Sequence, residues 1–142
     1  MYLFRLLLAI WTLGLLGTLA ELFLLEHFDG ALQSIPLVML ALGAVVSAWY
    51  ASRRNRASLR AFEATLVVFA IGGALGLVLH YRGNVEFEKE RAPELHGWSL
   101  FWHAITGATP ALAPGTMTFL AAIGFAVIIA DPRGQPGRAG VH

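Results

Sequence analysis

Residues 31–50 read ALQSIPLVMLALGAVVSAWY, and no side chain in this stretch is charged. A helix needs about 20 mostly apolar residues to cross the roughly 30 Å hydrocarbon core of a bilayer. Three further stretches approach the same length and composition: residues 6–25, 62–81 and 112–130. The four stretches predict an all-α fold, namely an antiparallel four-helix bundle that is integral to a membrane.

The composition of the whole chain agrees with this prediction. Of its 142 residues, 57% are hydrophobic and 13% are charged, whereas soluble domains average about 25% charged residues. The low charge and the net charge of +1 exclude a disordered chain, a coiled coil and a nucleic-acid-binding protein. The chain contains no cysteine, which excludes disulfides, thiolate metal ligands and thiol catalysis. Lys89 is the single lysine among ten basic residues, and this bias towards arginine is typical of a GC-rich bacterial genome.

The arginines lie beside alternate ends of the predicted spans. They comprise Arg5, four arginines between residues 51 and 61, and Arg133 and Arg138. Because basic residues favour the cytoplasmic side of a membrane, we expect both termini to be cytoplasmic in a bacterial inner membrane. The first apolar run is longer than a signal-peptide core, so we expect it to be retained rather than cleaved. Residues 1–130 then form one membrane domain, and residues 131–142 a disordered cytoplasmic tail.

Residues 82–111 form the long segment on the opposite, extracytoplasmic side. Apolar residues recur at helical spacing in residues 95–106, which predicts a short interfacial helix with Trp98 and Trp102 as anchors. Residues 107–115 are rich in proline and glycine and predict a turn leading into the fourth span. The alternating acids of residues 85–90 predict an extended piece or a solvated turn.

Two glycine-containing faces predict how the helices pack. Gly14 and Gly17 share a face of the first span, and Gly72 and Gly76 share a face of the third. We expect the first and third spans to pack through these glycines.

Each glycine face leads to an ionisable residue near the outer side, Glu21 on the first span and His80 on the third. Because a carboxylate in hydrocarbon turns towards a partner or towards water, a Glu21–His80 contact is one interpretation. The alternative is that Glu21 reaches the membrane surface or acts as a polar contact within the bundle.

The outer side also carries the candidate ligand-binding residues, which are Glu21, His80, Arg82, Asn84 and Glu86. A second set, His27, His80, His103 and Glu21, has the side chains that a divalent metal takes. The spacing of this second set matches no metal motif. A haem is disfavoured, because His80 is the one histidine inside a predicted span.

The function predicted from these features is that of a non-enzymatic accessory or binding module of a membrane, acting through the outer His/Glu/Arg site. The sequence has no nucleophile elbow and no phosphate-binding glycine loop. Two alternatives stay open: an oligomeric ion-coupled exporter that uses Glu21, and a metal-dependent membrane enzyme. The expected partners are the lipid bilayer, further copies of the chain or a larger membrane complex, and no nucleic acid.

Overall fold

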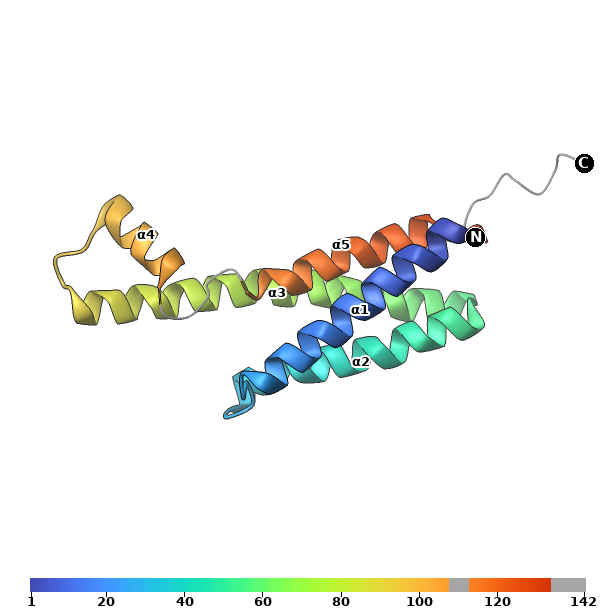
Figure 1. Ribbon diagram of the computed structural model, residues 1–142, viewed down its shortest axis with the longest axis horizontal. Helices are drawn as coiled ribbons and strands as arrows, with labels where there is room; N and C mark the ends of the chain where they lie inside the picture. Colours follow the sequence, from blue (N-terminus) through green and yellow to red (C-terminus); the bar gives the residue numbers. More distant parts are fainter. Residues whose placement is uncertain (108–112, 134–142) are drawn as a thin grey trace, which may run out of the picture. The chain divides into compact units, whose positions relative to one another are not determined.

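The computed structural model describes residues 1–107 and 113–133, and these form five helices and no strand (Figure 1). The helices are α1 (Tyr2–Leu24), α2 (Ala31–Arg53), α3 (Arg56–Arg91), α4 (Gly97–Thr106) and α5 (Gly115–Ile129). The predicted all-α class is therefore confirmed. Residues 108–112 of the predicted Pro/Gly-rich turn and residues 134–142 of the predicted tail lie outside the described residues.

The chain divides into two compact units, which are described separately. The first unit contains residues 1–69 and the residues from Leu120 onward, and the second contains residues 70–119. Helices α3 and α5 contribute residues to both units.

Three helices, α1, α2 and α3, are long and apolar enough to cross a membrane. Helix α5 is equally apolar but has only 15 residues, which corresponds to a rise of about 22 Å. Three of the four predicted spans therefore correspond to helices that are long enough to cross a membrane, and α5 is shorter.

Helix α3 is longer than predicted, because it continues through Arg91 instead of ending near residue 81. The prediction of an extended piece or a solvated turn at residues 85–90 is wrong. Glutamate, lysine and arginine are good helix formers when they face water, and residues 56–92 contain no proline. The charges end the apolar pattern in this segment without ending the helix.

The connection between α2 and α3 is shorter than the predicted loop of residues 51–61. Arg54 adopts a left-handed conformation, with φ 47°, and α3 begins two residues later. The Asn55 side-chain oxygen accepts a hydrogen bond from the Ser58 backbone N–H at 2.8 Å, and the Ser58 hydroxyl accepts one from the Asn55 N–H at 3.1 Å. This reciprocal cap satisfies donors at the start of α3, which therefore begins directly after α2.

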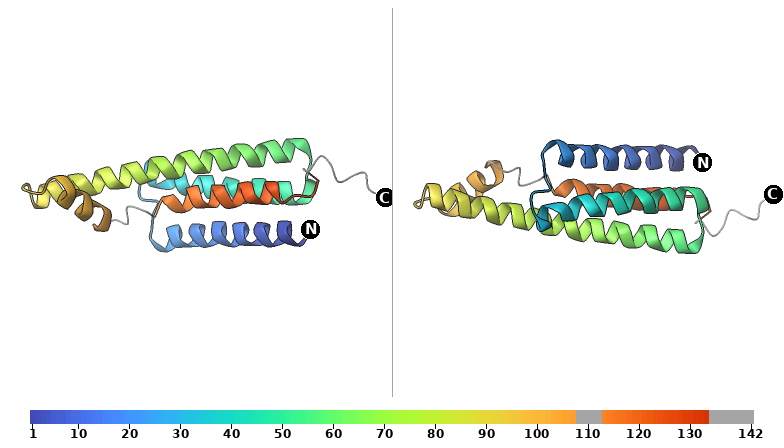
Figure 2. Two further views of the ribbon diagram at one scale, coloured as in Figure 1. Left: turned by 90° about the horizontal axis from the view of Figure 1, so that it is seen from above. Right: turned by 90° about the horizontal axis from the view of Figure 1, so that it is seen from below.

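The first unit is packed around the side chain of Trp11, which is fully buried. Its ring lies edge-on to Phe62 with the ring centres 5.2 Å apart, and its Nε1 donates a hydrogen bond to the Leu120 carbonyl at 3.0 Å. Gly43 of α2 lies directly against Phe69 of α3, since a Cβ added to Gly43 would lie 2.6 Å from Phe69 Cζ. Trp11 thereby joins α1 to parts of α3 and α5 that lie far apart in the sequence, and α2 lies beside α1 (Figure 2).

A second set of contacts joins helix ends in the first unit. The Tyr50 hydroxyl donates a hydrogen bond to Asp131 Oδ2 at 2.8 Å, and both residues are buried. Tyr50 also stacks on Phe62, with ring centres 5.0 Å apart, and the Arg54 guanidinium carbon lies 4.1 Å from the centre of the Phe4 ring. The start of α1, the end of α2, the start of α3 and the end of α5 therefore meet at one place.

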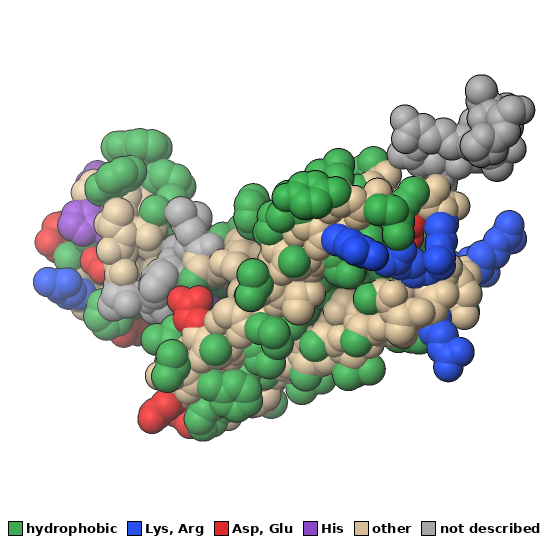
Figure 3. Space-filling model, turned by 45° about the vertical axis from the view of Figure 1, so that its right-hand side comes forward, with side chains coloured by type: hydrophobic (Ala, Val, Ile, Leu, Met, Phe, Trp, Pro, Cys, Tyr) green, Lys and Arg blue, Asp and Glu red, His purple; other side chains and the backbone are tan. Residues whose placement is uncertain are grey.

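This place is also where the basic residues of the first unit gather, and we call it the arginine end. It holds Arg5, Arg53, Arg54, Arg56, Arg60 and Arg133. Figure 3 shows the blue side chains of this unit at one end and red acidic side chains at the other. Two acids, Glu63 and the buried Asp131, also belong to the arginine end, so the separation of charge by sign in the first unit is partial.

The two glycine faces belong to different units, so their predicted packing on each other stays a prediction, and the neighbours of each face are described within its own unit. A Cβ added to Gly14 would lie 2.8 Å from the Leu120 side chain, and one added to Gly76 would lie 2.6 Å from Pro114 Cβ. Gly17 is exposed with open space beside it, and Gly72 is half-buried. Gly14 and Gly76 do permit close packing, but the close neighbour of each belongs to α5 or its preceding turn. Trp11 of α1 packs against α3 through the rings of Phe62 and Phe69.

Replacing Trp11 with Phe should destabilise the first unit. The variant loses the hydrogen bond to Leu120 and leaves a cavity, which together cost about 2 kcal/mol. Thermal unfolding in detergent micelles measures this, with Trp49→Phe as the control because Trp49 is 42% exposed. Equal unfolding temperatures for the two variants would contradict the central position of Trp11.

Candidate functional site

A polar face runs along the part of α3 that belongs to the second unit. His80, Asn84 and Glu88 are spaced by four residues and so share one side of the helix. His80 is half-buried, whereas Asn84 and Glu88 are only 4% and 5% exposed. Buried amide and carboxyl groups are costly without partners, so the neighbours of this face determine what it can do.

Helix α4 folds back against this face and supplies those neighbours (Figure 1). The Asn84 amide nitrogen donates a hydrogen bond to the Ala104 carbonyl at 2.8 Å. His103 Nδ1 lies 4.0 Å from Glu88 Oε2, where a protonated imidazole would stabilise the carboxylate. The Glu88 side chain is 7% exposed and that of His103 is 55% exposed. The pair therefore places a histidine in solvent contact above a buried carboxyl group.

Aromatic side chains complete the attachment of α4 to α3. The ring of Phe101 lies 5.9 Å from that of Tyr81 on α3, and Trp98 stacks on Phe101 at 4.9 Å. Trp98 and Trp102 are nevertheless 74% and 56% exposed. The inward side of α4 thus packs on α3, and its outward side presents two indole rings.

These indoles border a shallow depression on α4. Its volume is about 450 Å³, and it is lined by Trp98, Ser99, Trp102 and His103. Binding sites for small ligands span about 300–1,000 Å³ and are commonly lined by aromatic groups with a few polar ones. The depression has suitable side chains for recognition, and His103 connects it to the buried Glu88.

The structure brings together some of the predicted ligand-binding residues. His80 and Asn84 share the polar face, whereas Arg82 and Glu86 are exposed on α3. Glu88 belongs to this polar face but was not among the predicted site residues. An extended strand would put Glu86, Glu88 and Glu90 on the same side, so that conformation does not distinguish Glu88 from the other two acids. In a helix, Glu88 lies four residues after Asn84 and therefore on the same face, and this spacing is the signal that identifies it.

The other candidate residues fall in different units. Glu21 and His27 belong to the first unit, and His80 and His103 to the second. The Glu21–His80 contact therefore stays a prediction. Glu21 is exposed in the last turns of α1, and its predicted inward orientation stays a prediction.

The candidate metal set also stays a prediction. In residues 1–107 and 113–133, no three or more histidine, aspartate or glutamate side chains are arranged to hold a metal ion. His103 and Glu88 would supply two ligands, which is fewer than a protein zinc site uses.

Comparison of the chain with models of protein families, with curated proteins and with solved structures found no match.

Removing the Asn84 side chain should loosen α4. Asn84→Ala loses the hydrogen bond to Ala104, so the amides of residues 97–106 should exchange with deuterium at least about fivefold faster. Hydrogen exchange read by mass spectrometry measures this, and Glu86→Ala is the control on the exposed side of the same helix. If both variants exchange like the unchanged protein, Asn84 does not hold α4.

Proposed function

We propose that the chain is a multi-pass membrane protein that acts as a binding module, and that it recognises a partner protein through α4 on the extracytoplasmic side. The observation that carries this proposal is the outward pair of indoles on α4, which packing within the second unit leaves exposed. No catalytic step is assigned to it.

The membrane part of the proposal rests on the outer surface of the long helices. Leu13, Leu32, Val45 and Leu75 are between 59% and 75% exposed. Soluble monomers rarely expose continuous apolar surface beyond a few hundred Å², whereas helices that are apolar on all sides are typical of a lipid environment. Lipid tails would cover these side chains and so remove the unfavourable free energy of exposing them to water.

The orientation follows from the arginine end. Basic residues favour the cytoplasmic side, so the arginine end faces the cytoplasm of a bacterial cell. Helix α3 begins there at Arg56 and has 36 residues, a rise of about 54 Å, compared with a hydrocarbon core of roughly 30 Å. Its last turns and α4 then lie beyond the opposite surface.

Helix α5 provides the fourth crossing in this proposal. Its 15 residues are fewer than a typical span uses, and a short span is accommodated by local thinning of the bilayer. The hydrogen bond between Tyr50 and Asp131 supports this arrangement, because it fastens the end of α5 at the arginine end of the first unit.

The binding part of the proposal rests on the chemistry of α4. Tryptophan is enriched at the centres of protein interfaces, where one large ring supplies much of the binding energy. His103 and Ser99 border the same depression and offer hydrogen bonds. A partner with an apolar or aromatic segment would cover Trp98 and Trp102, and His103 would respond to its charge. This favours an accessory subunit of a larger membrane complex.

Photo-crosslinking in intact cells tests this function. A benzophenone amino acid at Ser99 should yield a protein adduct of defined mass, and Trp98→Ala should reduce its amount at least about fivefold, as expected for a principal interface residue. The same probe at Ser52, which is exposed on α2, should not yield that adduct.

Trp49→Ala serves as the matched tryptophan control and should leave the Ser99 adduct unchanged. If Ser99 crosslinks to lipid alone, α4 is a membrane anchor and the binding function is wrong. An adduct that persists at full yield in Trp98→Ala would also contradict it.

A further inference from the structure

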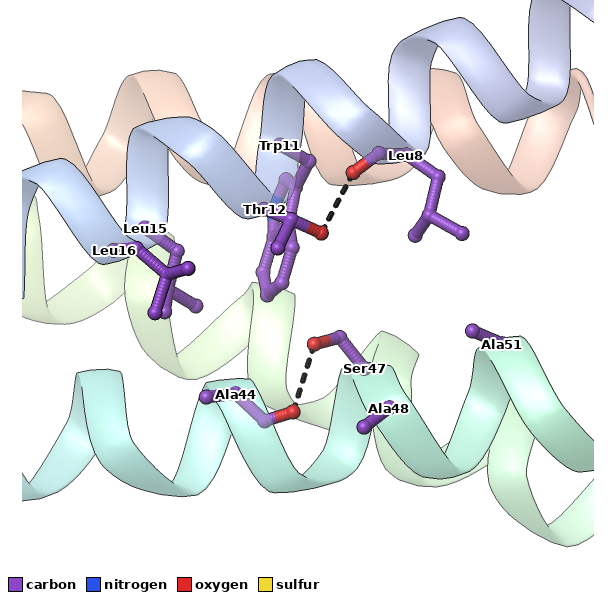
Figure 4. Close-up of a pocket in the computed structure, with 9 residues that line it drawn as sticks. All are labelled: Leu8, Trp11, Thr12, Leu15, Leu16, Ala44, Ser47, Ala48 and Ala51. Carbon is purple, nitrogen blue, oxygen red and sulfur yellow. Dashed lines mark hydrogen bonds between the residues drawn. The ribbon is translucent and has the colours of Figure 1, made fainter.

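A groove lies between α1 and α2 in the first unit (Figure 4). Its volume is about 140 Å³, and Trp11 and Leu15 of α1 face Ala44 and Ala48 of α2 across it. The indole of Trp11 and the small side chains of α2 line this space together. A cavity of about 150 Å³ lined by apolar side chains holds a group the size of benzene, so the groove admits part of a hydrocarbon chain.

The polar side chains in the groove wall are turned back to their own helices. The Thr12 hydroxyl donates a hydrogen bond to the Leu8 carbonyl at 2.8 Å, and the Ser47 hydroxyl donates one to the Ala44 carbonyl at 3.0 Å (Figure 4). Both hydroxyl protons are used within the protein. The groove therefore presents a largely apolar wall to whatever occupies it.

One end of the groove leads to the arginine end of the unit. Leu8 and Ala51 lie at the same end of the groove in Figure 4. Arg5 precedes Leu8 by three residues on α1, and Arg54 follows Ala51 by three residues at the end of α2. The Arg54 guanidinium packs over Phe4, the residue before Arg5. Both arginines therefore lie within about one helical turn of the end of the apolar groove, Arg5 on α1 and Arg54 at the end of α2.

Neither of these arginines forms a direct ion pair with a carboxylate, although the buried Asp131 belongs to the same end of the unit. In the described part of the chain the single ion pair joins His103 and Glu88, so Arg5 and Arg54 have no acidic partner among residues 1–107 and 113–133. Two cations beside the mouth of an apolar groove complement a molecule with a hydrocarbon chain and an anionic head.

We propose that this groove binds an anionic phospholipid of the cytoplasmic leaflet, with part of an acyl chain between α1 and α2 and the phosphate at Arg5 and Arg54. The proposal rests on the membrane part of the proposed function. A second copy of the chain is a poorer fit, because a packed helix needs an axis separation of 8–10 Å and a groove of about 140 Å³ is too small to hold one. Basic pockets between membrane helices bind anionic headgroups in this way.

Trp11 offers a direct reporter, because it forms part of the groove wall. Trp49, Trp98 and Trp102 are exposed, so replacing all three with Phe leaves Trp11 as the single fluorophore. The full chain is reconstituted in phosphatidylcholine vesicles that contain small fractions of brominated phosphatidylglycerol or brominated phosphatidylcholine. The mole fraction that gives half-maximal quenching of Trp11 should be at least about fivefold lower for the anionic lipid, since one membrane-surface arginine contributes roughly this factor.

Matched variants separate the site from general attraction to a basic surface. Arg5→Gln with Arg54→Gln should abolish the preference for phosphatidylglycerol, whereas Arg56→Gln with Arg60→Gln removes the same charge from the start of α3 and should retain it. Ala48→Leu fills the groove and should reduce quenching by the anionic lipid, whereas Ala41→Leu, on the exposed side of α2, should not.

Two results would overturn the proposal in distinguishable ways. Equal quenching by the two lipids, or equal loss in the two arginine double variants, would exclude the lipid site while leaving the chain in the membrane. Absence of quenching by either lipid would contradict the site alone, because Trp11 is fully buried, whereas failure of the chain to float with the vesicles in a density gradient would contradict the membrane part of the proposed function.

Discussion

The buried indole of Trp11 is the contact on which the arrangement of the first unit depends. Apolar helices have little to distinguish one neighbour from another in a lipid environment, because lipid tails are as apolar as leucine. A directed contact therefore specifies which helices meet. The Trp11 Nε1–H reaches the Leu120 carbonyl, and the ring meets Phe62 and Phe69. The ring also forms part of the wall of the groove between α1 and α2 that is proposed to hold a phospholipid.

A second directed contact operates at the arginine end. The hydrogen bond between Tyr50 and Asp131 joins the ends of α2 and α5, and the stacking of Tyr50 on Phe62 adds the start of α3. Asp131 also accepts a hydrogen bond from the Arg133 backbone N–H at 3.1 Å. A buried carboxylate is acceptable here because it has two donors. Packing consequently gathers the arginines at one end of the first unit, which is the end proposed to meet lipid headgroups.

The fold class, the three long helices and the short helix of residues 97–106 could be predicted from hydrophobic patterns. The extent of α3 could not, because apolar periodicity stops where its charged turns begin, although glutamate and lysine favour a helix as readily as leucine does. For the same reason Glu88 was not predicted as a site residue, although its helical spacing from Asn84 places it on the buried face. The two-residue turn at Arg54 and Asn55 depends on a left-handed arginine, which composition does not indicate.

The glycine faces illustrate a different difficulty. Gly14 and Gly76 permit close approach, as a small residue must, but a small residue does not specify what approaches it. Their neighbours are Leu120 and Pro114. Tertiary contacts of α5, a helix of 15 residues, decide this pairing. Hydropathy identifies α5 as apolar but does not assign its neighbours.

Charge is proposed to orient the helices in the membrane, with the arginine end in the cytoplasm and α4 outside. The chain has no cysteine, so single Ser52→Cys and Ser99→Cys variants can be labelled in intact spheroplasts with a membrane-impermeant maleimide. The account predicts that Ser99→Cys reacts at once and that Ser52→Cys reacts only after the membrane is permeabilised. Reaction of both before permeabilisation, or the reverse order, would contradict it.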